Sequence, residues 1–158
     1  SLTVVKMEGW KRDMTYKETG LKWVLTSPHI PNMNTSFYYP LSGIVGELSV
    51  LSVGVGYTMP FELFGVSWAN ADTLASAMNA LKLDGLLFRP IVYKPYYAFG
   101  KGELLQGVQV YITDFEKAKL TEVQFYVLQE LKKLYPQKDF FTLSGQKNCR
   151  SFDYVCGS

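Results

Sequence analysis

The segment 70–82 repeats its apolar residues with the 3.6-residue period of an α-helix. Asn70 or Asp72 can cap the first turn with a side-chain oxygen, and Gly85 is placed to end the helix. One face carries the apolar side chains of Leu74, Ala77, Met78 and Leu81. The pattern therefore predicts an amphipathic helix that buries this face.

A second and longer helical pattern covers residues 121–135. Thr121 and Gln124 have the spacing of a capping box, in which two side chains satisfy free N–H groups of the first turn. Lys132 and Lys133 lie near the negative end of the helix dipole, and Pro136 follows the pattern. The predicted buried stripe consists of Val123, Val127, Leu131 and Leu134.

The remaining apolar runs have the two-residue alternation or the short length of β-strands. We expect strands at residues 2–7, 86–88, 91–93 and 107–113. Residues 9–40 are predicted to contain loops and no long helix, because prolines recur at positions 28, 31 and 40. Residues 41–51 fit a short buried helix or a strand equally well. Together these elements predict an α+β fold with a mixed, mainly antiparallel sheet and two main helices.

The composition indicates a folded domain and gives no sign of a nucleic-acid or membrane partner. Of the 158 residues, 47% are hydrophobic and 19% are charged, which is enough apolar material for a core. The net charge is only +2, and the basic residues are spread along the chain. No apolar run reaches the roughly 20 residues of a membrane-spanning helix. Cys149 and Cys156 leave two alternatives, free thiols or a short-loop disulfide, and no metal site is expected because His29 is the only histidine.

The segment 52–61, with the sequence SVGVGYTMPF, indicates a loop in which backbone approaches another group closely. A dinucleotide-binding fingerprint requires a third glycine where Met59 stands, and a P-loop requires a Gly-Lys-Ser/Thr sequence that is absent. A tight turn with positive φ at Gly54 or Gly56 explains both glycines without a ligand. Glu47 and Glu62 flank the loop, and paired carboxylates are what glycoside hydrolysis requires.

Several motifs occur in the order and spacing of one bacterial family. They are LTVVKMEGWKR, TGLKWVLTSPHIP, YPLSGIVGE, SVGVGYTMPFELFGVSW, DGLLFRP and LQGVQVYITD, followed by the terminal SFDYVCGS. On these motifs the chain resembles the NamZ-type exo-β-N-acetylmuramidase family of peptidoglycan-recycling proteins. The resemblance implies that residues 1–158 are the C-terminal domain of a two-domain glycoside hydrolase. It also implies a periplasmic or extracellular location and the release of N-acetylmuramic acid.

The resemblance places the catalytic chemistry outside this sequence. The family's proposed catalytic carboxylates and its Gly-Pro-Glu-His-Gly motif belong to an upstream Rossmann-like domain, and neither they nor the family's final helical segment occur here. We therefore expect this chain alone to be inactive, with its catalytic residues unknown and no cofactor or metal required. The implied partners are the upstream domain and a peptidoglycan-derived sugar, held in a cleft that faces both domains.

The positions that match family motifs give the predicted substrate contacts. Val50 and Val55 depart from the family pattern, which has an asparagine and an arginine at these positions, so the family resemblance does not fix the substrate. Glu47 and Tyr57 are expected to face the cleft; the alternative is that Glu47 caps backbone N–H groups and Tyr57 packs into the core. The alternative function is a non-catalytic carbohydrate-binding or protein-interaction module, or a scaffold that only covers the upstream domain. The predicted contacts are Ser27, His29, Glu47, Ser52, Gly54, Gly56, Tyr57 and Thr58.

Overall fold

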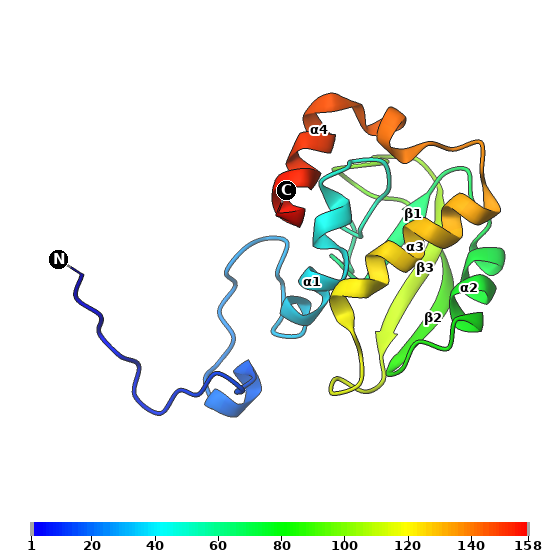
Figure 1. The fold of residues 1–158 in the computed structure, drawn as a ribbon. Coiled ribbons are helices and arrows are strands. Elements are labelled where there is room, and N and C mark those ends of the chain that lie inside the picture. Colours follow the sequence, from blue (N-terminus) through cyan, green and yellow to red (C-terminus); the bar gives the residue numbers. More distant parts are fainter. Residues whose placement is uncertain (1, 158) are drawn as a thin grey trace.

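The computed structural model describes residues 2–157, which form four α-helices, one 3-10 helix and a three-stranded sheet (Figure 1). The sheet is antiparallel at both of its strand pairings, and the predicted α+β class is confirmed. The helices are α1 (Thr35–Gly46), α2 (Ala71–Ala80), α3 (Leu120–Leu134), α4 (Phe140–Cys156) and the 3-10 helix η1 (Tyr16–Thr19), and the strands are β1 (Leu63–Val66), β2 (Leu86–Tyr93) and β3 (Leu105–Ile112).

Strand β3 is central in the sheet, with β1 and β2 on either side of it. The sequence pattern divided residues 86–93 into two strands at Pro90, and this division is wrong, because these residues form the single strand β2. Pro90 pairs with Val108 in the middle of the ladder. It is tolerated because β2 is an edge strand, so the N–H groups on its outer side need no partner strand.

Helix α2 packs against β2 and β3, and α3 lies between α2 and α1 (Figure 1). Both predicted amphipathic helices are confirmed, and the Asn70 side chain caps α2 by accepting a hydrogen bond from the Thr73 N–H at 2.9 Å. Burial of each such aliphatic side chain contributes about 1.5–3 kcal/mol. The buried residues of these helices and the sheet include Leu74, Met78, Phe88, Val108, Val110, Val123, Val127 and Leu131.

Helix α1 contradicts the expectation that no long helix lies in residues 9–40, and it settles the ambiguity of residues 41–46. The helix continues through Pro40, although proline cannot donate the backbone hydrogen bond of a helix interior. The buried side chain of Gln124 on α3 bonds to the α1 backbone on both sides of this turn. Its Nε2 donates to the Pro40 carbonyl at 3.0 Å, and its Oε1 accepts from the Val45 N–H at 3.0 Å.

The capping box predicted for Thr121 and Gln124 is therefore wrong. Helix α3 begins at Leu120 with Lys119 as its N-cap, and no side-chain hydrogen bond caps it. The Gln124 amide instead reaches the neighbouring helix and the carbonyl of Thr121 at 3.1 Å. The Gln124 side chain therefore makes a tertiary contact with α1, although the local sequence pattern predicted that it caps its own helix.

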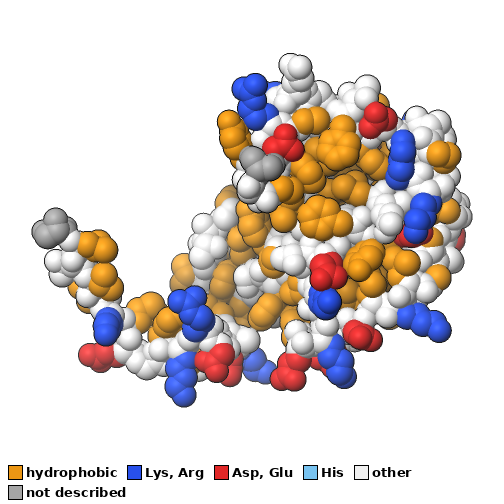
Figure 2. All heavy atoms as spheres, viewed as in Figure 1, with side chains coloured by type: hydrophobic (Ala, Val, Ile, Leu, Met, Phe, Trp, Pro, Cys, Tyr) orange, Lys and Arg blue, Asp and Glu red, His pale blue; other side chains and the backbone are white. Residues whose placement is uncertain are grey.

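The strand predicted at residues 2–7 is also wrong for the described structure, where this segment is extended without a strand partner. Residues 2–25 run away from the packed helices and sheet (Figures 1 and 2). Their apolar side chains are largely exposed; Leu2 is 89% exposed and Val5 is 90% exposed. The alternation that predicted a strand is present, but the segment pairs with no strand of the described residues.

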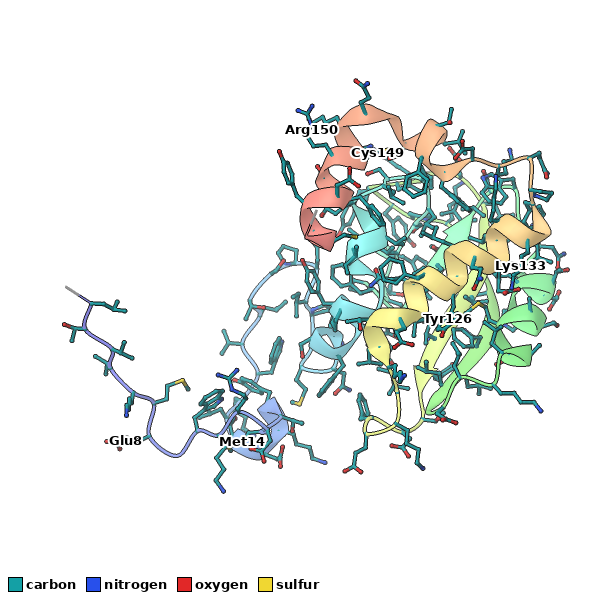
Figure 3. The ribbon with its side chains drawn as sticks, in the orientation of Figure 1. Glu8, Met14, Tyr126, Lys133, Cys149 and Arg150 are labelled. Carbon is teal, nitrogen blue, oxygen red and sulfur yellow. The ribbon has the colours of Figure 1, made fainter. Side chains whose placement is uncertain are left out.

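The 3-10 helix η1, strand β1 and helix α4 were not predicted from the sequence. Strand β1 is buried at all four residues, so it has no alternation of apolar and polar positions. Helix α4 is interrupted at Gly145, where φ is +76°, and Ser144 fixes it to the α1 end by donating a hydrogen bond to the Leu48 carbonyl at 2.6 Å. Cys149 (Figure 3) and Cys156, both on α4, are free thiols. Among residues 2–157, no helix has the length and apolar character needed to cross a bilayer.

Candidate functional site

A cleft of about 330 Å³ opens beside the C-terminal end of α1. Its walls come from α1, from the segment 49–55 that contains the first glycine of the loop, and from residues 98–99 of the β2–β3 connection. Glu47 and Ser52 are the two predicted contacts that line it. The full lining is Tyr39, Gly43, Gly46, Glu47, Ser49, Leu51, Ser52, Val53, Val55, Phe61, Ala98 and Phe99.

Glu47 follows the last residue of α1 and is exposed to solvent. No hydrogen bond or ion pair joins its carboxylate to any other residue of the range 2–157. Its backbone N–H, and not its side chain, closes the last turn through the carbonyls of Ile44 and Val45. The alternative in which Glu47 caps backbone N–H groups therefore does not describe this structure, and the carboxylate is available to a ligand.

The two glycines of the loop are explained by backbone geometry. Gly54 and Gly56 have φ of +83° and +90°, a region that residues with a Cβ adopt at a cost. A Cβ at Gly54 would overlap the Met59 carbonyl oxygen, and one at Gly56 would overlap the Tyr97 carbonyl oxygen. The Gly56 carbonyl in turn accepts a hydrogen bond from the Tyr96 N–H at 2.8 Å. The loop thus fixes the β2–β3 connection against the cleft by direct backbone contact.

Ser52 and Tyr57 have structural contacts of their own. Ser52 is buried, exchanges two backbone hydrogen bonds with Gly65 on β1, and accepts one from the Gly54 N–H on its Oγ at 3.3 Å. Tyr57 is half-buried, with its ring 5.1 Å from that of Tyr93 and packed on a small core cluster that includes Leu63. Tyr57 is not part of the cleft lining, which agrees with the packing alternative.

Ser27 and His29 reach the cleft's outer loop from a different part of the chain. They lie in a turn in which the Ile30 N–H donates to the Ser27 carbonyl at 3.0 Å. The His29 ring is within hydrogen-bond distance of Tyr97, 3.1 Å from Nδ1 to Oη. Tyr97 directly precedes the lining residues 98–99, so this pair ties the turn to the cleft wall. Thr58 is exposed on the glycine loop and lies outside the lining.

The predicted contacts did not include four residues of the cleft wall, Tyr39, Phe61, Ala98 and Phe99. Two of them, Tyr39 and Phe61, lie within the family motifs YPLSGIVGE and SVGVGYTMPFELFGVSW, and this was the signal that could have found them. Tyr39 and Phe61 meet edge to face at 4.9 Å, which presents the Tyr39 ring as a fixed wall. Among the described lining residues Glu47 is the one charged side chain. Such a site suits a neutral ligand with hydroxyl groups and an apolar face, because carboxylates accept hydrogen bonds and rings stack.

Within residues 2–157, no three His, Cys, Asp or Glu side chains lie close enough together to hold a metal ion.

Two family models cover this chain, one after the other. The model of the C-terminal part of exo-beta-N-acetylmuramidase NamZ matches residues 37–158, and that of the N-terminal part matches residues 1–34. The two matches meet just before and within the first turn of α1. The boundary thus falls where the extended segment passes into the packed part of the fold.

The chain is similar to two proteins that are more than twice its length. Peptidoglycan beta-N-acetylmuramidase NamZ of Bacillus subtilis (strain 168) is 37% identical over 157 residues, which are 99% of this chain and 36% of that protein. The crystal structure of a DUF1343 family protein from Bacteroides fragilis matches with a TM-score of 0.92 at 52% identity, over 97% of this chain and 40% of that chain. From the family match over residues 37–158 and these two relatives, the chain belongs to the exo-β-N-acetylmuramidase NamZ family.

Proposed function

We propose that this chain lines the substrate cleft of a peptidoglycan-degrading exo-β-N-acetylmuramidase, as the C-terminal domain of a two-domain protein. The observation that carries the proposal is the cleft beside α1, with the Glu47 carboxylate unpartnered among residues 2–157. A carboxylate at the C-terminal end of a helix faces the negative end of the dipole, which is an unfavourable position without a ligand. In this proposal a sugar hydroxyl or amide N–H donates to it.

The cleft walls supply the other part of sugar recognition. Tyr39 is 54% exposed and Phe99 is 37% exposed, so both rings present faces on which a sugar ring can stack. Val55 lines the cleft where the family pattern has an arginine, and Val50 is buried in the core. We propose that the loss of this cation makes the cleft less suited to a carboxylate-bearing ligand than that of the family's main branch.

The upstream partner is proposed from the extended N-terminal segment. Its apolar side chains are exposed, and its residues match the N-terminal family model. Exposed apolar surface of this extent is typical of an interface. We propose that residues 2–25 pack on a Rossmann-like upstream domain, which supplies the catalytic carboxylates, and that the protein works in the periplasm or outside the cell. Cell fractionation tests the location, and detection only in the cytoplasm would refute it.

The enzymatic proposal is tested with a chromogenic N-acetylmuramide. The two-domain protein should hydrolyse it, and the 158-residue chain alone should not, because loss of general acid catalysis costs about 10²–10⁴ in rate. Glu47→Gln in the two-domain protein should lower kcat/KM about tenfold or more with an unchanged melting temperature, while the exposed Glu103→Gln should change neither. Comparable hydrolysis by the chain alone would refute the division of labour.

A second function, sugar binding without catalysis, is favoured by the single carboxylate of the cleft. Glycoside hydrolysis uses two carboxyl groups, and the described lining contains one. Calorimetric titration of the two-domain protein with N-acetylmuramic acid separates the alternatives. Binding without turnover supports the binding module, and neither binding nor turnover supports a scaffold.

A further inference from the structure

A second pocket, of about 420 Å³, shares no lining residue with the cleft that contains Tyr39 and Phe61. It is lined by Tyr38, which precedes Tyr39 in the sequence, and by Glu62, which follows Phe61. The segment before α1 and the β3–α3 connection complete the wall, and the described lining contains no Lys or Arg. The lining residues are Asn32, Asn34, Tyr38, Glu62, Ile112 and Phe115.

Glu62 is the charged group of this pocket, and a partly buried hydrogen-bond network orients it. The Arg89 guanidinium donates two hydrogen bonds to Gln109 Oε1, at 2.8 and 3.2 Å, which directs the Gln109 Nε2 toward the Glu62 carboxylate at 3.5 Å. A donor–acceptor distance of 3.5 Å makes a weak hydrogen bond, so the carboxylate keeps most of its capacity to accept. Burial raises the pKa of Glu62, which is the expected result for a carboxylate with too few hydrogen bonds.

The other polar groups of the pocket can donate hydrogen bonds. Burial, and next the charge of Glu62, raise the pKa of the Tyr38 phenol, so this hydroxyl stays protonated. Asn32 Oδ1 accepts hydrogen bonds from the N–H groups of Asn34 and Thr35, at 3.0 and 3.2 Å. Its amide nitrogen is not used in these bonds and can donate to a ligand. The site therefore combines one acceptor with several neutral donors.

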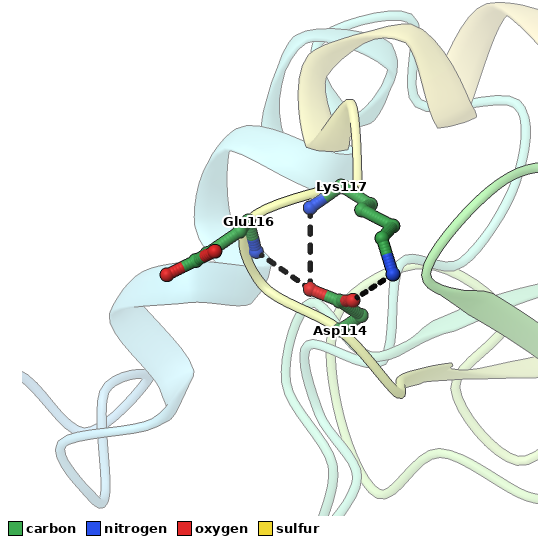
Figure 4. A network of polar contacts seen from close by, with 3 residues as sticks. All are labelled: Asp114, Glu116 and Lys117. Carbon is green, nitrogen blue, oxygen red and sulfur yellow. Dashed lines mark hydrogen bonds and ion pairs between the residues drawn. The ribbon is translucent and has the colours of Figure 1, made fainter.

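Phe115 gives the pocket an aromatic wall. Its ring packs on Phe37 at 4.8 Å between centroids, and it remains 52% exposed. The turn that carries it is fixed by Asp114, whose carboxylate accepts from the Glu116 N–H at 3.0 Å and forms an ion pair with Lys117 at 2.8 Å (Figure 4). A ring fixed in this way is preorganised for stacking.

We propose that this pocket is a second saccharide subsite, which binds a neutral pyranose ring between Phe115 and the Glu62 carboxylate. The ring's apolar face stacks on Phe115, its hydroxyl or amide groups donate to Glu62, and its oxygens accept from Tyr38 and Asn32. The absence of Lys and Arg from the described lining disfavours an anionic ligand. The subsite is distinct from the cleft of Glu47, and it does not depend on the muramidase activity proposed above.

The test uses Phe115→Trp in the intact protein that carries this chain, as a fluorescent reporter at the pocket. Methyl β-N-acetylglucosaminide should shift the added emission in a saturable way. Glu62→Gln in the same background should weaken the apparent affinity about tenfold, because a charge-assisted hydrogen bond becomes neutral. Glu47→Gln and the neighbouring exposed Glu116→Gln should leave the affinity unchanged.

Three results would overturn the proposal. They are the absence of any shift with the sugar, an equal loss of affinity with Glu47→Gln, and a shift with methylammonium but not with the sugar, which would make the pocket a cation site. Because the fluorescence reports the pocket and the chromogenic assay reports turnover, failure of one proposal is distinguishable from failure of the other.

Discussion

Gln124→Glu distinguishes the tertiary role of this side chain from the local one that its sequence position suggests. If Gln124 belonged to a capping box, glutamate would serve equally well, and the free energy of unfolding would change by less than about 0.5 kcal/mol. In the structure the amide is fully buried and donates to the Pro40 carbonyl, which a carboxylate cannot do. The two views therefore predict different stabilities for one substitution.

The magnitude follows from the groups left without partners. The Pro40 carbonyl loses its donor, at about 1–3 kcal/mol. The introduced carboxylate is buried between two carbonyl oxygens, so it is desolvated or takes up a proton, at about 2–3 kcal/mol for a pKa raised by two units. The Val45 N–H keeps its acceptor. We expect a loss of about 3–6 kcal/mol at pH 7, which becomes smaller as the pH falls and the introduced carboxyl group is protonated.

The assay is urea unfolding followed by far-ultraviolet circular dichroism, at pH 7 and pH 5. Gln129→Glu is the matched control, because Gln129 is exposed on the same helix and receives the same charge. If the two variants differ by less than about 0.5 kcal/mol, Gln124 does not join α1 to α3 as the structure indicates.

Three further substitutions test other parts of the structure. Gly56→Ala should cost about 2 kcal/mol or more, from its positive φ and its contact with Tyr97, whereas Gly102→Ala, with a similar φ and open space, should cost about 1 kcal/mol; equal losses in thermal melts would contradict the contact. Leu131→Ala, in the buried stripe of α3, should cost about 2–5 kcal/mol in urea, and a value below about 0.5 kcal/mol would mean that the buried face is wrong. Burial raises the folded-state pKa of Glu62 above its ordinary 4.5, so the ionised carboxylate destabilises the folded state at pH values above that pKa. Glu62→Gln should therefore raise the free energy of unfolding at neutral pH and leave it unchanged below pH 4, where Glu62 is protonated in both states. A difference that does not depend on pH would refute this.

Local patterns in the sequence were sufficient to predict an element when its amphipathic periodicity alone determines which side chains are buried. Helices α2 and α3 are amphipathic, so their periodicity predicted both the elements and the buried residues Leu74 and Leu131. The sequence motifs also identified the family, because they occur in order over the whole chain. The glycines of the loop needed only a turn with positive φ, which the structure contains.

Local patterns failed wherever a distant partner determines the outcome. Gln124 of α3 lies 84 residues beyond Pro40 and holds this part of α1 to α3 by donating a hydrogen bond to the Pro40 carbonyl. The alternating residues 2–7 form no strand, because a strand requires a partner and this segment pairs with no strand of residues 2–157.

The sites divide in the same way. The sequence by itself determined the family, the α+β class, and Glu47 as a candidate contact, since motifs and periodicity are properties of the chain alone. Only the tertiary structure decided that Glu47 lies in a cleft, that Tyr57 packs on Tyr93, and that Glu62 faces a separate pocket. The physical reason is that a side chain's surroundings depend on residues far away in sequence, which pack against it only when the chain folds.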